Sequence, residues 1–484
     1  MGLAGILVAL GLLMWLSFRG WSVLLLAPAA ALVAAAFAGE PLLAHWTQTF
    51  MRSAAQFVAQ FFPIFLLGAL FGKLMDDSGS VQAIADFMSR RLGHRRAILA
   101  VVLAGALVTY GGVSLFVAFF VLAPMARELF RAANIPRRLM PAAIALGTFT
   151  FTMSAMPGTP AIQNTIPMPF FGTTPFAAPG LGIVASAIML AFGLWWLTRA
   201  EASARRRGEG YGEDAEPASD AAADDQFIRE RATSSHEFDP AEIPHGERGD
   251  GQPPAGTAAI PLVVVIGVNL VMSLLILPRL DFSFLAQERW GGTSLAGVAG
   301  VWSVAVALGA AIAVLVALQR ARLPDLRASM DAGANAAVLP IISVASLVGF
   351  GAVVAALPAF AAVREWVLAI SGGPLVSLAI ATNVLAALTG SASGGLTIAL
   401  DALGSTYLQI ARTSGIDPAL MHRIAVIGSG TLDSLPHNGA VVTLFAVCGS
   451  THRKSYFDMA MASVVGPIIA LAAVIVLGSM LGSF

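Results

Sequence analysis

Long apolar stretches, broken only by short polar turns, fill this chain from end to end. In the first half they cover residues 2–17, 21–38, 49–75, 97–126, 140–167 and 177–198, and in the second half 258–278, 293–318, 334–358, 375–404, 419–447 and 457–482. Most are long enough for a helix to cross the ~30 Å hydrocarbon core of a bilayer. The pattern predicts an all-α polytopic membrane protein.

One polar stretch interrupts the pattern. Residues 199–257 are rich in Glu, Asp, Ala, Gly and Pro and have almost no apolar periodicity. Such composition is typical of solvated, largely disordered chain. The sequence therefore divides into a first transmembrane repeat at 1–198, a linker at 199–257 and a second transmembrane repeat at 258–484.

The two apolar halves resemble each other at an offset near 280 residues, which is the signature of an internal repeat. The matching motifs share their order along the chain: Trp21-Ser22-Val23 with Trp302-Ser303-Val304, Pro63-Ile64 with Pro340-Ile341, Gly111-Gly112-Val113-Ser114 with Gly394-Gly395-Leu396-Thr397, and TMSAMPGTP from Thr152 with TLDSLPHNG from Thr431. We expect one structural unit to occur twice.

The fourth apolar segment of each half carries a glycine- and serine-rich middle, where a re-entrant helical hairpin can turn back. Non-helical backbone at membrane depth is tolerated only inside protein or beside a wet cavity. With such a hairpin each half makes about five crossings, so the two repeats have inverted topology. Basic residues then divide 22 against 6 between the two sides. The positive-inside rule places the linker in the cytoplasm and both termini outside.

Inverted repeats with interrupted helices are typical of secondary transporters, whose substrate sits where the broken helices meet. Four pieces are predicted to converge: the hairpin tips at 110–114 and 389–397, and the helix breaks at 154–159 and 433–439. Backbone amides at a half-helix start carry partial positive charge, and Ser, Thr, Gln and Asn can bond to hydroxyl groups.

The candidate substrate ligands are the small, polar or helix-breaking residues of these four pieces: Gly111, Gly112, Ser114, Ser154, Pro157, Gly158, Thr159, Gln163, Asn164, Thr389, Ser391, Ser393, Gly394, Gly395, Ser434 and Asn438. Close helix packing is the competing explanation for the glycines. For the hydroxyl residues it is bonding back to their own helix beside a proline kink.

Asp433 and His437 are the candidates for proton coupling. They are spaced i, i+4 beside Pro436, inside an apolar segment. Ionisable groups at membrane depth are costly and tend to line ion pathways. The alternative is that Asp433 caps the second half-helix and His437 bonds to a carbonyl. Nearby, His422 and Arg423 begin a helix on the outer side, where an interfacial arginine is common.

Composition narrows the functional classes. Hydrophobic residues make up 57% of the chain and charged residues 12%, mean hydropathy is +0.79, and the net charge is zero. The single cysteine, Cys448, excludes an internal disulfide and a cysteine metal cluster. HExxH, GxSxG and Walker motifs are absent from the sequence. We expect no enzyme activity, cofactor, metal or nucleic acid partner, and transport that is ion-driven or, as a rival class, a passive anion channel.

The motifs GALFGKLMDDSGSVQAIADFMSRRLG from Gly68, PGTPAI from Pro157, and the stretch from Gly428 to Asn438 resemble the gluconate permease (GntP) family of proton symporters. The resemblance implies uptake of gluconate or related sugar and hydroxy acids with protons. It also implies an elevator-like movement of the hairpin-bearing domain. We therefore expect the protein in the lipid of a bacterial inner membrane, and related carriers suggest a homodimer.

Two departures distinguish this chain from the gluconate members. Met156 stands where they have a histidine, and Gly439 stands where they have an acidic residue. The pattern PGTPAIQN with DSLPHNGAVV is similar to the branch assigned to 3-hydroxybutyrate-like monocarboxylates, which is the alternative substrate class.

Overall fold

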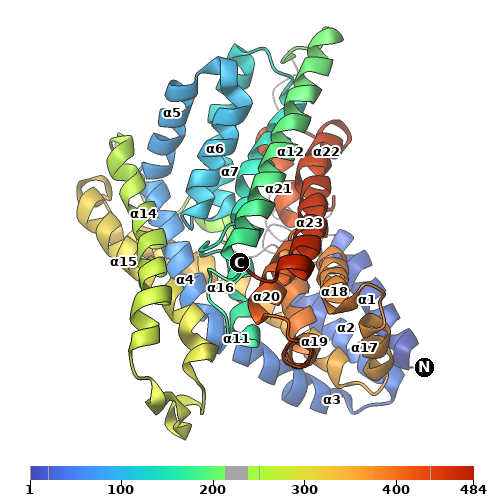
Figure 1. Ribbon diagram of the computed structural model, residues 1–484. Helices are drawn as coiled ribbons and strands as arrows, with labels where there is room; N and C mark the ends of the chain where they lie inside the picture. The colour runs from blue at the N-terminus through green and yellow to red at the C-terminus, as the bar shows by residue number, and fades with distance from the viewer. Residues whose placement is uncertain (1, 20, 213–237, 250, 437) are drawn as a thin grey trace.

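The computed structural model describes residues 2–19, 21–212, 238–249, 251–436 and 438–484. Within these ranges the regular structure is helical throughout (Figure 1). Six continuous helical stretches among the described residues, counted with their adjoining helical turns, are long and apolar enough to cross a membrane: Leu42–Asp77, Pro179–Arg206, Ala255–Arg279, Leu295–Arg322, Leu326–Ala356 and His452–Leu481. The prediction of an all-α polytopic membrane protein is confirmed.

Six helices pack as a row through the molecule. The central pair is α4 (Met51–Asp77) and α16 (Leu326–Ala356), which pack along their length. On one side α16 contacts α2 (Val23–Ala38), which pairs with α1 (Gly2–Phe18). On the other side α4 contacts α15 (Leu295–Gln319), which pairs with α14 (Ala255–Val271). Figure 1 shows the α14–α15 and α1–α2 pairs at opposite sides.

Both segments expected to re-enter fold as helical hairpins. The first consists of α6 (Ala97–Tyr110) and α7 (Leu115–Ala132), and the second of α18 (Gly373–Thr389) and α19 (Ala392–Ser414). A serine side chain caps the start of each returning helix. The Ser114 hydroxyl accepts from the Phe116 amide at 3.3 Å, and the Ser391 hydroxyl accepts from the Gly394 amide at 3.1 Å.

The second tip lies earlier than the sequence match suggests. The turn is at Gly390, whose φ of +62° favours glycine, whereas Gly394 and Gly395 lie inside α19. A Cβ on Gly395 would collide with the backbone of Ala386 in α18. A Cβ on Gly394 would collide with Leu347 of α16. Close packing against α18 and α16 therefore explains this glycine pair.

Each half also contains a helix interrupted at mid-length. In the first, α8 (Met140–Thr148) is followed by the short helices α9 (Phe151–Ser154), α10 (Ile162–Thr165) and α11 (Pro167–Phe171). In the second, α20 (Pro418–Ser429), one 3-10 turn at Leu432–Ser434 and α21 (Gly439–Cys448) follow one another. Each broken helix packs on its hairpin, α8 on α6 and α20 on α18.

The remaining helices complete the two halves. A long helix follows each broken one, namely α12 (Pro179–Arg206) and the pair α22 (His452–Ala460) and α23 (Gly466–Leu481). Two short helices fall between the predicted segments, α5 (Ser80–Leu92) and α17 (Phe360–Leu368). The elements thus follow the same order in both halves, while their inverted orientation stays a prediction.

The linker differs from its expectation where it is described. Helix α12 continues to Arg206, and residues 238–249 pack on the protein. The Asp239 amide donates to Ala336 O at 2.8 Å, and the buried Lys73 ammonium donates to Ile243 O at 2.8 Å. Residues 238–249 thus cover the charged end of α4, and these polar contacts explain why this polar segment is ordered against the protein. Residues 213–237 of the linker lie outside the described residues.

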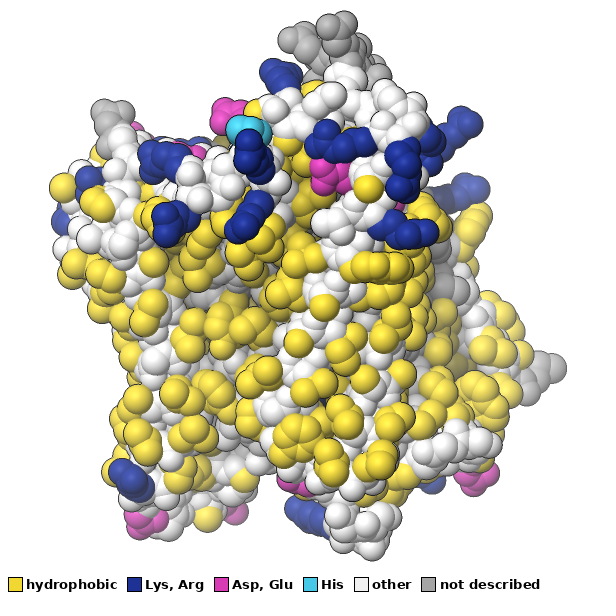
Figure 2. Space-filling model, turned by 45° about the horizontal axis from the view of Figure 1, so that its top comes forward, with side chains coloured by type: hydrophobic (Ala, Val, Ile, Leu, Met, Phe, Trp, Pro, Cys, Tyr) yellow, Lys and Arg dark blue, Asp and Glu magenta, His cyan; other side chains and the backbone are white. Residues whose placement is uncertain are grey.

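Charge is distributed unevenly along the molecule. Figure 2 shows Lys and Arg side chains gathered at the upper end above a broad hydrophobic surface, with few at the lower end. This asymmetry agrees with the uneven division of basic residues expected from the sequence.

Candidate functional site

A small cavity lies where the two hairpins and the two broken helices meet. Its walls come from all four pieces: Leu115, Phe149, Met153, Gln163, Ala392, Asp433, Ser434, Asn438 and Ala440. The hairpins and broken helices meet as expected, but the first hairpin and the first break contribute Leu115, Phe149, Met153 and Gln163, which lie beside the predicted ranges 110–114 and 154–159 and not within them. Of the sequence-predicted site residues, Gln163, Asp433, Ser434 and Asn438 line this cavity.

Three helices begin at the cavity. Leu115 is the first residue of α7, Ala392 is the first residue of α19, and Ala440 is the second residue of α21. Side-chain caps already bond one or two amides at each start, and the helix dipole still attracts negative charge there. Convergence of three such starts creates a region suited to an anion without a basic side chain.

Gln163 provides an unused hydrogen-bond acceptor. Its side chain is 3% exposed, and its Oε1 atom has no hydrogen-bond partner among the described residues. A buried acceptor without a donor is unfavourable by about 1–3 kcal/mol. A ligand that brings a hydroxyl or a protonated carboxyl group would satisfy it.

Asp433 places a carboxyl group in the same cavity. Its Oδ1 accepts from the Ser434 hydroxyl at 3.2 Å, and no cation pairs with it among the described residues. A carboxylate without a cation at membrane depth is costly in its charged form. His437, the second proton-coupling candidate, lies outside the described residues.

Asn438 joins the second break to the second hairpin. Its Nδ2 donates to Gly390 O at 2.9 Å, while its Oδ1 accepts from the amides of Ala440 at 2.6 Å and Val441 at 3.3 Å. The side chain therefore caps α21 and holds the hairpin tip at once. Because both polar atoms are already bonded, Asn438 shapes the cavity wall.

Side chains from neighbouring helices donate hydrogen bonds to the backbone carbonyl groups of the first break. The Tyr110 hydroxyl donates to Pro157 O at 2.8 Å, which connects the first hairpin tip to the break. The Asn269 side chain of α14 donates to Gly158 O at 3.0 Å. Pro157 and Gly158 thus contribute backbone acceptors that the protein itself satisfies.

Arg423 is the residue that the sequence reasoning misjudged. It is fully buried, not interfacial. Its Nε and Nη2 donate to Ala177 O at 3.1 and 2.6 Å, and its Nη1 donates to Ala155 O at 3.1 Å. No carboxylate pairs with it in the part of the chain that the structure describes. The guanidinium of the second broken helix is therefore bonded to the first break at Ala155 and to the segment before α12 at Ala177.

Asn164 lies in the same network. Its Nδ2 donates to Thr159 O and Pro175 O, both at 3.0 Å. Its Oδ1 lies 3.4 Å from Arg423 Nη1 and 3.2 Å from His422 Nε2. These bonds make Asn164 part of the scaffold of the break. An adjacent His-Arg pair followed by a long apolar run was the only sequence signal for this network.

Several predicted ligands are occupied by local bonds. Ser154 donates to Thr150 O at 3.0 Å, and Thr389 donates to Leu385 O at 2.8 Å. The Thr159 hydroxyl accepts from the Ala161 amide at 3.3 Å, and the Ser393 hydroxyl lies 3.3 Å from that of Ser391.

The first-tip residues lie elsewhere. Gly111 packs against Leu262. Gly112 and Ser114 line a neighbouring cavity between α4, the first hairpin and the first break, which shares Leu115 and Met153 with the central cavity.

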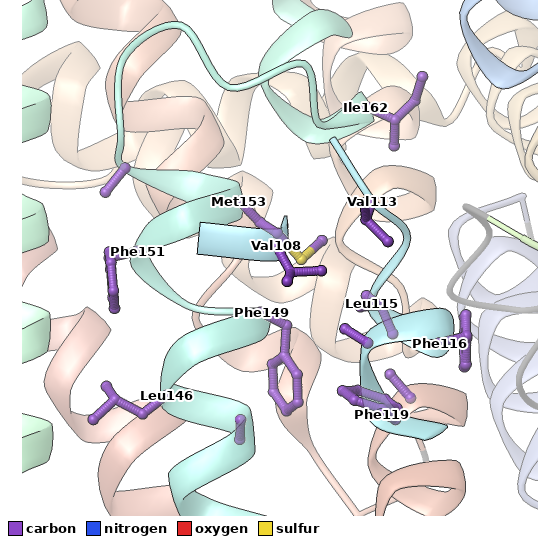
Figure 3. Close-up of a cluster of buried hydrophobic side chains, with 14 of the residues drawn as sticks. Val108, Val113, Leu115, Phe116, Phe119, Leu146, Phe149, Phe151, Met153 and Ile162 are labelled. Carbon is purple, nitrogen blue, oxygen red and sulfur yellow. The ribbon is translucent and has the colours of Figure 1, made fainter. Parts of the chain in front are cut away.

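Apolar side chains form one wall of the central cavity. Figure 3 shows Leu115, Phe149 and Met153 close together in a buried cluster that also includes Phe119. The rings of Phe119 and Phe149 meet edge to face, with centroids 6.1 Å apart. This wall joins the start of α7 to the first broken helix.

Comparison with known proteins places these features in a family. A sequence model described as "GntP family permease" matches residues 1–171. An uncharacterized transporter, YxjC of Bacillus subtilis (strain 168), is 41% identical over 462 residues, which cover 94% of each chain. A high-affinity gluconate transporter of Escherichia coli (strain K12) is 36% identical over 105 residues, or 21% of this chain and 23% of that protein.

Proposed function

The chain belongs to the GntP family of permeases and is a membrane transporter rather than an enzyme, and from this premise we propose that it imports a small hydroxylated carboxylate together with protons. The observation that carries the proposal is the central cavity. It is lined by three helix starts, by Gln163, whose Oε1 has no partner among the described residues, and by Asp433, which no described cation pairs with.

The helix starts favour an anionic group, but Asp433 opposes it when ionised. Two like charges about 4 Å apart repel by about 4 kcal/mol at an effective dielectric constant near 20. A helix start contributes only about 0.3–1 kcal/mol to anion binding. Protonation of Asp433 removes the repulsion, so an anion and a proton are expected to enter the cavity together.

The acceptor on Gln163 supports a hydroxylated substrate. A substrate hydroxyl can donate to Oε1 while the substrate carboxylate lies at the helix starts. This division of roles would discriminate hydroxy acids from plain fatty acids, because an acid without the hydroxyl leaves the acceptor unsatisfied.

The lining of the cavity favours a short hydroxy monocarboxylate of the 3-hydroxybutyrate type as the second candidate. Five of the nine lining residues are apolar, and both polar atoms of Asn438 are already bonded. Gluconate carries a hydroxyl on each carbon beyond the carboxylate and would need more partners than Gln163 and Ser434 provide. The similarity to a gluconate transporter supports the gluconate class instead.

We expect the hairpins and broken helices to move as a unit against the row of helices around α4 and α16, as in an elevator-like carrier. The contacts that support this assignment are the packing of α6 on α8 and of α18 on α20, which join each hairpin to its broken helix.

Counterflow in proteoliposomes tests the proposal. Vesicles loaded with gluconate, 3-hydroxybutyrate or butyrate are assayed for exchange of labelled substrate, and then for accumulation driven by an inward proton gradient. Saturable exchange of a hydroxy acid with gradient-driven accumulation is expected. Flux that neither saturates nor accumulates would identify a passive channel and refute the proposal.

A further inference from the structure

A second cavity lies at the end of the molecule that carries the C-terminal end of α12, in the groove between α12 and α22. Its polar walls include Arg138, Arg199, Arg207 and Lys454, and its aromatic walls are Trp196 and Phe457. It shares no lining residue with the central cavity.

Positive charge exceeds negative charge at this groove. Among the described residues, four basic side chains line it, against the carboxylates of Asp458 in the wall and Glu209 beside it, which gives an excess of two positive charges within that part of the chain. Hydrogen bonds from Arg138 hold the pKa of Glu209 below its ordinary value of 4.5, so Glu209 is ionised in this count at neutral pH.

The two carboxylates are already bonded within the protein. Arg138 contacts both Glu209, at 2.6 Å, and Asp458. Asp458 also accepts from Trp196 Nε1 at 3.0 Å. Arg199 is exposed and makes no ion pair with the described residues. Its guanidinium is therefore available to an external anion.

The groove also opens onto apolar surface. Phe457 is 68% exposed and Trp195 is 54% exposed. Phe457 meets the Trp196 ring edge to face at 5.7 Å between centroids. Exposed aromatic rings beside basic residues at the end of a membrane-spanning helix are typical of the headgroup level of a bilayer.

We propose that the groove between α12 and α22 binds the headgroup of an anionic phospholipid, with the lipid phosphate at Arg199, Arg207 and Lys454 and its acyl chains along Phe457 and Trp195. Phosphate is the matching chemistry because planar guanidinium groups bond its oxygens in pairs. The exposed rings favour a lipid over free phosphate, which has no apolar part to cover them.

Native mass spectrometry of the purified full-length protein tests the site. The probe is phosphatidylglycerol titrated into micelles of a zwitterionic detergent, with phosphatidylcholine and millimolar inorganic phosphate as parallel arms. The site variant is Arg199→Gln/Arg207→Gln/Lys454→Gln. The charge-matched control is Arg206→Gln/Arg95→Gln/Arg96→Gln, whose residues are exposed at the same end and do not line the groove.

Each basic residue near an anionic headgroup contributes about fivefold in affinity, so the site variant should weaken phosphatidylglycerol binding on the order of 100-fold. The control should stay within about threefold of the parent. Equal loss in both variants, or no loss in either, would overturn the proposal. Displacement of the lipid by inorganic phosphate would identify a free-anion site instead and would also overturn it.

A folding defect is separated from a binding defect by size-exclusion elution and thermal unfolding without added lipid. If the triple variant unfolds, Arg199→Gln alone replaces it, because that side chain makes no ion pair with described residues. About fivefold weaker lipid binding is then expected, and an unchanged affinity would refute the site.

Discussion

Replacing Asp433 by asparagine should separate substrate binding from proton coupling. The change keeps the shape of the side chain and removes its charge, so the variant imitates the protonated state. Asparagine can still bond to the Ser434 hydroxyl, which lies 3.2 Å from the carboxylate in the parent protein. We therefore expect the fold and the cavity to survive.

The size of the effect follows from the repulsion that protonation removes. About 4 kcal/mol between like charges 4 Å apart corresponds to roughly 10³-fold in affinity, since 1.4 kcal/mol is about tenfold. In the parent, substrate affinity should fall as pH rises and Asp433 ionises. In Asp433→Asn it should stay high and independent of pH.

Transport assays in proteoliposomes distinguish the two activities. Asp433→Asn should retain counterflow exchange but lose accumulation driven by a proton gradient, because it carries no proton across. Asp401→Asn is the matched control, since Asp401 is an exposed carboxyl on α19 that does not line the cavity. Gradient-driven accumulation by Asp433→Asn at the parental level would remove Asp433 from the coupling mechanism. The same assay applies to His437→Ala, for which loss of accumulation is also expected.

Two substitutions in the site and one pH series at the α12–α22 groove give further tests. Gln163→Leu should raise the KM for a hydroxy acid about tenfold without lowering thermal stability, since Oε1 has no partner among the described residues. An unchanged KM ratio between 3-hydroxybutyrate and butyrate would contradict its role. Asn438→Ala removes the cap of α21 and leaves Gly390 O unbonded, so the free energy of unfolding in detergent should fall by about 2–4 kcal/mol. An unshifted Tm would refute this role of Asn438. Hydrogen bonds from Arg138 hold the pKa of Glu209 below 4.5, so they stabilise the fold above pH 4.5, and this stabilisation is lost as the pH falls through the lowered pKa. Hydrogen exchange at residues 207–211 should therefore rise only in that acidic range. A rise near neutral pH would argue against this role.

Much of the fold follows from the apolar pattern. Lengths and hydrophobicity predict spanning helices, and Pro157 with Pro160 predicts a break, because proline removes backbone donors wherever it stands. The hairpins are equally local, since Ser114 and Ser391 cap the returning helices. The packing of residues 238–249 on Lys73 was not predictable, because it depends on a contact between positions 170 residues apart.

The sequence by itself determined that this is a helical membrane transporter, where its helices break, and which polar residues lie near the breaks, because these properties depend on composition and on neighbours along the chain. Only the tertiary structure decided which of those residues face the central cavity. Ser154 and Thr389 bond to their own helices, while Gln163 and Asp433 point to one space from opposite halves of the chain. Tertiary packing also buried Arg423, since its carbonyl partners Ala155 and Ala177 come from the other half. Side-chain direction at a helix break depends on what packs across it, and that partner is distant in sequence.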